Sequence, residues 1–254
     1  MQFISIIQNT YRETIRDKVL YNLLFFALGL IIVSVIVSQW SIGQEVKILK
    51  DFGLTVMSFF GLLMAIFIGI GLVHKEIEKR TVYPILSKPL SRVKFLLGKY
   101  FGLLFTLFVN FCIMTVVLYI VLFIFDKTVD LSLIKSIVLI FFEMILIIAF
   151  STLFSTFSTP TLSAVYSIII YIMGHLSKEA YLITQKNNPE NGISLIKIIY
   201  YIIPNLENFN IKTEIVHSVS IDDTRILFAV LYGILYSSVI LSIAVYIFKK
   251  RDFK

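Results

Sequence analysis

Long runs without a formal charge constrain this chain more than any other feature, because each has the length of a membrane-spanning helix. Residues 19–44, 52–73, 100–125 and 226–248 contain no Asp, Glu, Lys or Arg. About 20 residues of helix cross the roughly 30 Å hydrocarbon core of a bilayer. The chain is 58% hydrophobic, well above the roughly 45 to 50% of soluble domains. We therefore expect a membrane protein.

A further run, residues 136–177, has Glu143 as its only formal charge and is too long for a single crossing. The sequence "STFSTP" interrupts it, which predicts a tight turn and places Pro160 at or just before the first turn of the next helix. The apolar run at residues 193–203 is too short to span, so we interpret it as a re-entrant or interfacial helix. The expected fold is an all-α integral membrane protein with six transmembrane helices.

The whole chain is interpreted as one transmembrane domain, residues 1–254. Its expected segments are an interfacial helix (1–18), six spans (19–40, 52–73, 98–125, 134–155, 160–182 and 225–248), a cytoplasmic loop (74–95), an extracytoplasmic segment (183–224) and a cytoplasmic tail (249–254). Most of the 23 Lys and Arg residues lie in the N-terminal segment, in residues 74–99 and in the tail. The positive-inside rule therefore places both termini in the cytoplasm.

The net charge of +7 is interpreted as a sign of this orientation and of contact with the inner leaflet, and not of nucleic-acid binding. Phe3, Ile7, Tyr11 and Ile15 recur at helical spacing, which predicts an amphipathic helix on the membrane surface. The alternative is an ordinary cytoplasmic overhang. The single cysteine, Cys112, gives no basis for a disulfide framework or for paired metal thiolates.

The charged segment "KEIEKRTVYPILSKPLSR", residues 75–92, separates two of the apolar runs. Thr81 can cap a short helix that carries Pro84 in its first turn and ends at Pro89, and Ser91 can cap the next helix. Three apolar residues, Val82, Ile85 and Leu86, fall on one face of the short helix. From the residues alone, this loop is either a helical knob for a groove on a partner or a positive-inside anchor that packs on its own helix ends.

The stretch "EIEKRTVYPILSKPLSRVKFLLGK", residues 76–99, resembles the first cytoplasmic loop of permease subunits of ATP-binding-cassette (ABC) transporters of the type-2 exporter family. The matching positions are Glu76, Glu78, Thr81, Leu86, Pro89, Ser91, Arg92, Gly98 and Lys99. Arg80 stands where the family usually has glycine, and Leu90 replaces a valine. The N-terminal segment, the six spans and "IIPNLENFNI" before the last span extend the resemblance along the chain.

The resemblance implies a six-span permease subunit that pairs as a homodimer or heterodimer in a prokaryotic cell membrane. It implies two separate ATPase subunits, which bind ATP and Mg, and identifies residues 81–88 as the coupling helix. The coupling residues it favours are Glu76, Glu78, Thr81, Val82, Pro84, Ile85, Leu86, Pro89, Ser91 and Arg92. No phosphate-binding G-x-x-x-x-G-K-[ST] motif is present, so we expect no cofactor and no catalytic or metal site in this chain.

Three polar residues within the predicted spans, Asn110, Glu143 and His175, are candidates for contact with a transported substrate. Glu143 is interpreted first as a structural group, protonated or hydrogen-bonded to a serine, a threonine or Asn110, and second as a group in transport. Asn110 is interpreted as a helix-packing residue, and His175 as an interfacial one.

The preferred function is ATP-driven export of an apolar or amphipathic substrate, since the spans are nearly free of charge. A membrane scaffold that recruits an ATPase is the first alternative. A secondary transporter, the second, is disfavoured because Glu143 is the one buried charge expected near the midplane.

Overall fold

The computed structural model describes residues 2–40, 43–78, 91–127, 130–187, 202–217, 219 and 221–250. All regular elements within these ranges are helices: α1 (Gln2–Ile15), α2 (Lys18–Ser38), α3 (Glu45–Glu78), α5 (Arg92–Asp126), α6 (Ser132–Ser155), α7 (Pro160–Asn187), the 3-10 helix η1 (Leu206–Phe209), α9 (Lys212–Val216) and α10 (Asp223–Lys250).

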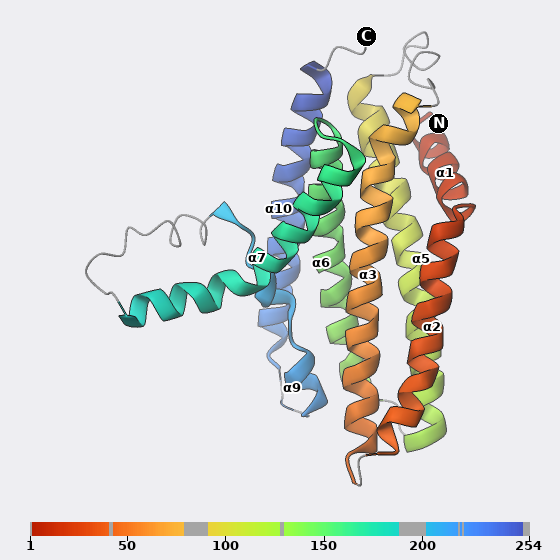
Figure 1. Cartoon of the computed structure of the whole chain (residues 1–254), viewed down its shortest axis with the longest axis vertical. Helices are drawn as coiled ribbons and strands as arrows, with labels where there is room; N and C mark the ends of the chain where they lie inside the picture. The colour runs from red at the N-terminus through yellow and green to blue at the C-terminus, as the bar shows by residue number, and fades with distance from the viewer. Residues whose placement is uncertain are drawn as a thin grey trace.

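Six of the helices, α2, α3, α5, α6, α7 and α10, have the length and composition to cross a membrane. This confirms the predicted fold class and the predicted number of spans. The start of α1 and the end of α10 lie at one end of the bundle, together with the ends of α3 and α5 that flank residues 79–90 (Figure 1). We call this the termini end, and the opposite end the far end.

Local side chains mark the starts of three helices. The Asp17 side chain accepts a hydrogen bond from Val19 N at the start of α2, and the predicted cap of α5 is confirmed, because Ser91 Oγ accepts from Lys94 N. Pro160 is the first residue of α7, after the turn that "STFSTP" predicts. A proline fits this position because the first N–H groups of a helix have no intrahelical acceptor.

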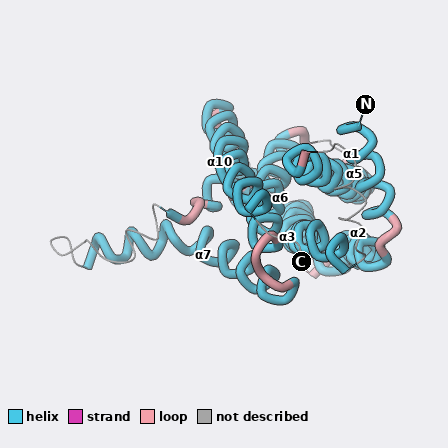
Figure 2. The backbone as a smooth tube through the Cα atoms, turned by 90° about the horizontal axis from the view of Figure 1, so that it is seen from above, coloured by secondary structure: helices cyan, strands magenta, loops and turns pink. Residues whose placement is uncertain are grey.

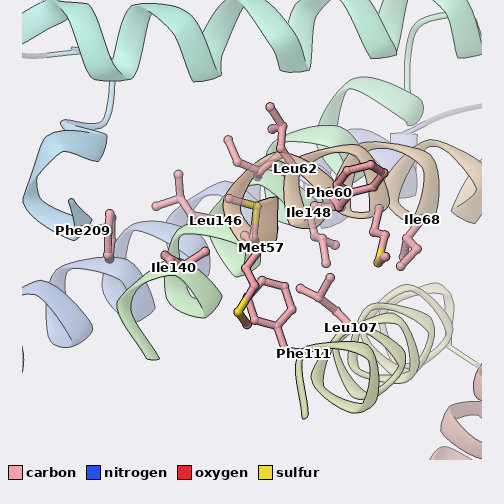
Figure 3. Close-up of a cluster of buried hydrophobic side chains, with 14 of the residues drawn as sticks. Met57, Phe60, Leu62, Ile68, Leu107, Phe111, Ile140, Leu146, Ile148 and Phe209 are labelled. Carbon is pink, nitrogen blue, oxygen red and sulfur yellow. The ribbon is translucent and has the colours of Figure 1, made fainter. Parts of the chain in front are cut away.

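The core of the molecule is built around α3 and α6. In each of these helices 72% of the most apolar window is buried inside the chain, against 22% in α2, α7 and α10. Seen from above, α3 and α6 lie between α10 on one side and α2 with α5 on the other (Figure 2). Met57 of α3, Phe111 of α5 and Ile140 of α6 meet in this core (Figure 3).

Small residues let the central helices approach closely. A Cβ added to Gly61 of α3 would lie 2.8 Å from Cζ of Phe111, so this position of α3 has no room for a side chain. Between α6 and α7, Ser151 Oγ donates a 2.9 Å hydrogen bond to Ser167 Oγ. Close packing of small residues and hydroxyl hydrogen bonds are the usual contacts between helices in a membrane.

The helix α7 changes direction along its length. It starts beside α6 and α3, and its second half extends away from the bundle, across the long axis of the molecule (Figure 1). The predicted span 160–182 falls within α7, but only the first half of α7 runs along the bundle, downward from the termini end in Figure 1. Of the predicted re-entrant run 193–203, all but residues 202 and 203 lie outside the described residues.

Candidate functional site

The predicted coupling loop joins the ends of α3 and α5 at the termini end. Glu76 and Glu78 lie in the last turns of α3, and their side chains are not described. The rest of the predicted coupling helix lies outside the described residues: Thr81, Val82, Pro84, Ile85, Leu86 and Pro89. Ser91 is the N-cap of α5 and Arg92 is its first residue. The described part of this site therefore consists of the helix ends on either side of the loop and their neighbours, which we call the frame.

One side of that frame is a contact between α5 and the end of α10. Arg92 Nη1 donates a 2.9 Å hydrogen bond to the carbonyl oxygen of Lys249. The rings of Phe95 and Phe248 stack with their centroids 6.5 Å apart. Arg92, which the family resemblance favours as a coupling residue, thus connects the last turn of α10 to the start of α5.

The other side of the frame is α1, which packs along α5. A Cβ added to Gly98 would meet Ile6 Cγ2 at 2.9 Å, and one added to Gly102 would meet Thr10 Cβ at 2.7 Å. Lys99 Nζ lies 3.7 Å from Glu13 Oε2. The Gly-Lys pair of the motif therefore has a structural role here: it brings α1 against α5. Whether α1 also lies at the membrane surface remains a prediction.

A second polar site lies between α6, α7 and the segment after α7. His175 Nε2 of α7 is 2.8 Å from Glu143 Oε1 of α6, and His175 Nδ1 is 3.3 Å from Glu207 Oε2 of η1. These two contacts need two hydrogens, and a neutral imidazole carries one. The cluster therefore contains either an imidazolium or a protonated carboxyl group. The side chain of Glu143 is only 2% exposed, so its partner determines how it can be buried.

Neighbouring groups complete this cluster. Asn210 Nδ2 donates to Glu207 Oε1 at 3.1 Å, and the ring centroids of Tyr171 and His175 are 4.7 Å apart. Burial lowers the pKa of the Lys212 ammonium on α9, while the charges of Glu143, Asp51 and Glu207 act in the opposite direction. The Lys212 ammonium is thus within electrostatic reach of the two carboxylates of the cluster, Glu143 and Glu207.

The expected partners of Glu143 were wrong. Its partner is His175, and not a serine, a threonine or Asn110. His175 was expected at the interface, but it faces α6 because α7 packs on α6 before it turns away. Asn110 Nδ2 donates within its own helix, to the carbonyl oxygen of Thr106. No local sequence pattern indicates a role for Glu207. It lies beside His175 because the fold places η1 next to α7.

Among the described residues, no group of three or more His, Cys, Asp or Glu side chains is placed to hold a metal ion. The geometry is that of a multi-pass helical membrane protein with a loop between α3 and α5 at one end and a buried ionisable cluster halfway along α6. This class leaves many families open.

The family follows from comparison with known proteins. The family model described as "ABC-2 family transporter protein" matches residues 4–253, and the chain belongs to this family. No curated protein sequence matches the chain. Membership supports a membrane permease of an ABC transporter, a membrane transport subunit that is not itself catalytic, and it implies association with ABC ATPase partners.

Proposed function

We propose that this chain is the permease subunit of an ATP-driven exporter, and that residues 75–92 transmit the motion of separate ATPase subunits to the spans. The observation that supports this most is the position of the loop. It connects α3, one of the two most buried helices, to α5, which also holds α1 and the end of α10. A displacement of the loop would therefore be transmitted to α3 and α5, and through α5 to α1 and α10.

The expected assembly contains two permease subunits and two ATPase subunits, with both termini and the loop in the cytoplasm. ATP and Mg would be held by the ATPase subunits. Such a machine works only if the ATP-bound partner binds one state of the permease better than the other, by about tenfold for each 1.4 kcal/mol of coupling. The apolar stripe Val82, Ile85 and Leu86 is the surface that would carry this difference.

The proposed substrate is apolar or amphipathic. Glu143 is buried beside His175, so the one carboxylate within the described central part of the spans is occupied by an internal contact. A charged, soluble substrate would need compensating charges along its path, because ions are costly to place in a low-dielectric medium.

The decisive experiment compares Leu86→Asp with the volume-conserving control Leu86→Met. The full chain is co-expressed with the ATPase that copurifies with it, and ATP hydrolysis is measured in nanodiscs. We expect Leu86→Asp to weaken ATPase binding more than about tenfold, because a carboxylate enters an apolar groove. Leu86→Met should retain binding and substrate-stimulated hydrolysis.

Full ATPase binding by Leu86→Asp would contradict the coupling role of the loop. ATPase binding without stimulation by any apolar or amphipathic compound would favour a scaffold. The orientation is tested separately with Ser87→Cys in a Cys112→Ala background, where a membrane-impermeant maleimide should fail to label intact cells. Labelling from outside would overturn the proposal.

A further inference from the structure

The imidazole ring of His175 lies between two carboxyl groups that come from different elements of the fold. Its Nε2 is 2.8 Å from Glu143 Oε1 of α6, and its Nδ1 is 3.3 Å from Glu207 Oε2 of η1. Both contacts are hydrogen bonds only if the cluster holds one proton more than a neutral imidazole between two carboxylates. Loss of that proton would leave a ring nitrogen and a carboxylate facing each other as two acceptors.

The two carboxyl groups differ in their freedom to move away. The side chain of Glu143 is 2% exposed and belongs to α6, one of the two most buried helices. The side chain of Glu207 is 33% exposed and belongs to a helix of four residues. Glu207 also lines a cavity of about 560 Å³, together with the exposed residues Lys178 and His217. The contact of His175 with Glu207 is therefore the one that would open.

The same cavity offers Glu207 a second cation. Lys178 lies three residues after His175, about one turn further along α7. A lysine ammonium keeps its charge over the pH range in which an imidazole titrates. Two basic side chains of one helix thus lie beside Glu207, and the charge of one of them depends on pH.

The other ionisable groups near the cluster act differently. Lys212 of α9 is within electrostatic reach of both carboxylates, and Asp51 of α3 acts on the same ammonium. The ring of Tyr171 packs edge-on against the imidazole, with centroids 4.7 Å apart. A change in the charge of Lys212 would affect both carboxylates, whereas a change at His175 acts directly on the contact with η1.

Apolar side chains limit how far η1 can move. A Cβ added to Gly174 of α7 would lie 2.6 Å from Leu206 Cγ, and one added to Gly233 of α10 would lie 3.1 Å from Phe209 Cζ. Leu206 and Phe209 are fully buried. Opening of the polar contact would therefore loosen η1 without detaching it from the bundle.

We propose that Glu143, His175 and Glu207 form a proton-binding site that controls how firmly η1 is held. With the proton bound, η1 is fixed against α7. Without it, Glu207 leaves His175 for Lys178 and η1 becomes mobile. Because the fixed state holds the additional proton, low pH favours it and it is lost as the pH rises. This inference does not depend on the proposed export function.

The first test follows the mobility of η1. A spin label is attached to Asn208→Cys, an exposed position of η1, in a Cys112→Ala background. Spectra of the full chain in nanodiscs are recorded between about pH 5 and pH 9, a range that brackets an imidazole. The label should become more mobile as the pH rises, and the ratio of the two states should change by at most about tenfold per pH unit, as for one proton. A label at Val239→Cys, exposed on α10, should show no change.

The second test removes the requirement for the proton. In Glu207→Gln the amide nitrogen can donate to an unprotonated Nδ1, and the amide oxygen can still accept from Asn210. We expect η1 to be fixed at every pH in this variant and mobile at every pH in Glu207→Ala. Glu214→Gln is the matched control, because Glu214 contacts Arg225, and it should retain the pH dependence.

The two lysines distinguish the mechanism from its alternatives. Lys178→Met removes the second cation, so the loosening of η1 should shift to higher pH. Lys212→Gln should retain the transition. The proposal would be overturned by a wild type whose label has the same mobility throughout the pH range. It would also be overturned by a transition that persists in Glu207→Gln or disappears in Lys212→Gln.

Discussion

At the termini end, α1 meets α5 across two glycines, whereas halfway along α6 this helix meets α7 and η1 around ionisable side chains. The first contact depends on shape, because Gly98 and Gly102 leave no room between the helices. The second depends on protonation and on burial of charge. A contact made by shape is insensitive to its chemical surroundings, while a contact made by buried ions changes with any movement that admits water.

The largest expected effect follows from His175→Leu. This change leaves Glu143 buried without its partner, and breaking a buried charged pair costs about 3 to 5 kcal/mol. The measurement is the free energy of unfolding in a sodium dodecyl sulfate titration followed by circular dichroism. The control is His217→Leu, since His217 is exposed. Adding Glu143→Leu to His175→Leu should recover most of the loss, and unchanged stability of the single variant would show that the cluster does not hold α7.

The contact at the termini end is tested by Gly102→Val. A side chain here would press on Thr10 and on the backbone oxygen of Ile7, so we expect a loss of about 1 to 3 kcal/mol in the free energy of unfolding. Gly29→Val is the matched control, because a Cβ at Gly29 meets no atom within 4 Å. Equal effects of the two substitutions would refute the close approach of α1 and α5.

A smaller effect, dependent on pH, is expected in the turn between α5 and α6. Lys50 Nζ donates to Asp130 Oδ2 at 2.7 Å. Burial acts to raise the pKa of the Asp130 carboxyl, but hydrogen bonds from Lys50 and Ser132 outweigh it, and the net pKa is below the ordinary value. A lowered folded-state pKa stabilises the fold above about pH 4, and this stabilisation is lost as the pH falls through the folded-state pKa.

The wild type should therefore lose about 1 kcal/mol more than Asp130→Asn when unfolding is measured at pH 3 instead of pH 7. Parallel pH profiles for the two proteins would show that the Lys50 contact contributes nothing to folding.

The smallest effect is expected for Lys135→Ala. Lys135 Nζ and Asp223 Oδ1 are 2.6 Å apart, but their side chains are 39% and 82% exposed. Exposed pairs contribute about 0 to 1 kcal/mol, so the loss should be below about 0.5 kcal/mol in the same titration. A loss as large as that of His175→Leu would mean that burial does not determine how much an ion pair contributes to the stability of this protein.

The elements that sequence reasoning predicted well are those with local causes. Uninterrupted apolar length predicts the six spans, and Ser91 and Pro160 mark helix starts because capping and the missing proline N–H act within one turn. The family resemblance came from a contiguous motif for the same reason. None of these inferences required knowing which helix lies beside which.

The partner of Glu143 could not be predicted in this way. His175 lies 32 residues further along the chain, and it reaches Glu143 because α7 packs on α6 before it turns. Glu207 joins them from an element of four residues that no periodicity identifies. The role of Gly102 could not be predicted either. Its sequence context resembles that of Gly29, but Gly102 lies against α1 and Gly29 has no neighbour within 4 Å.

The lengths of α3 and α5 have a mechanical consequence. With 34 and 35 residues these helices are each about 50 Å long, some 20 Å more than the hydrocarbon core is thick. Each helix therefore extends beyond the hydrocarbon core. If a helix of this length tilts by about 5° about one end, its other end moves by about 4 Å. A small tilt of α3 and α5 inside the bilayer thus displaces the ends of these helices outside the bilayer by several ångströms.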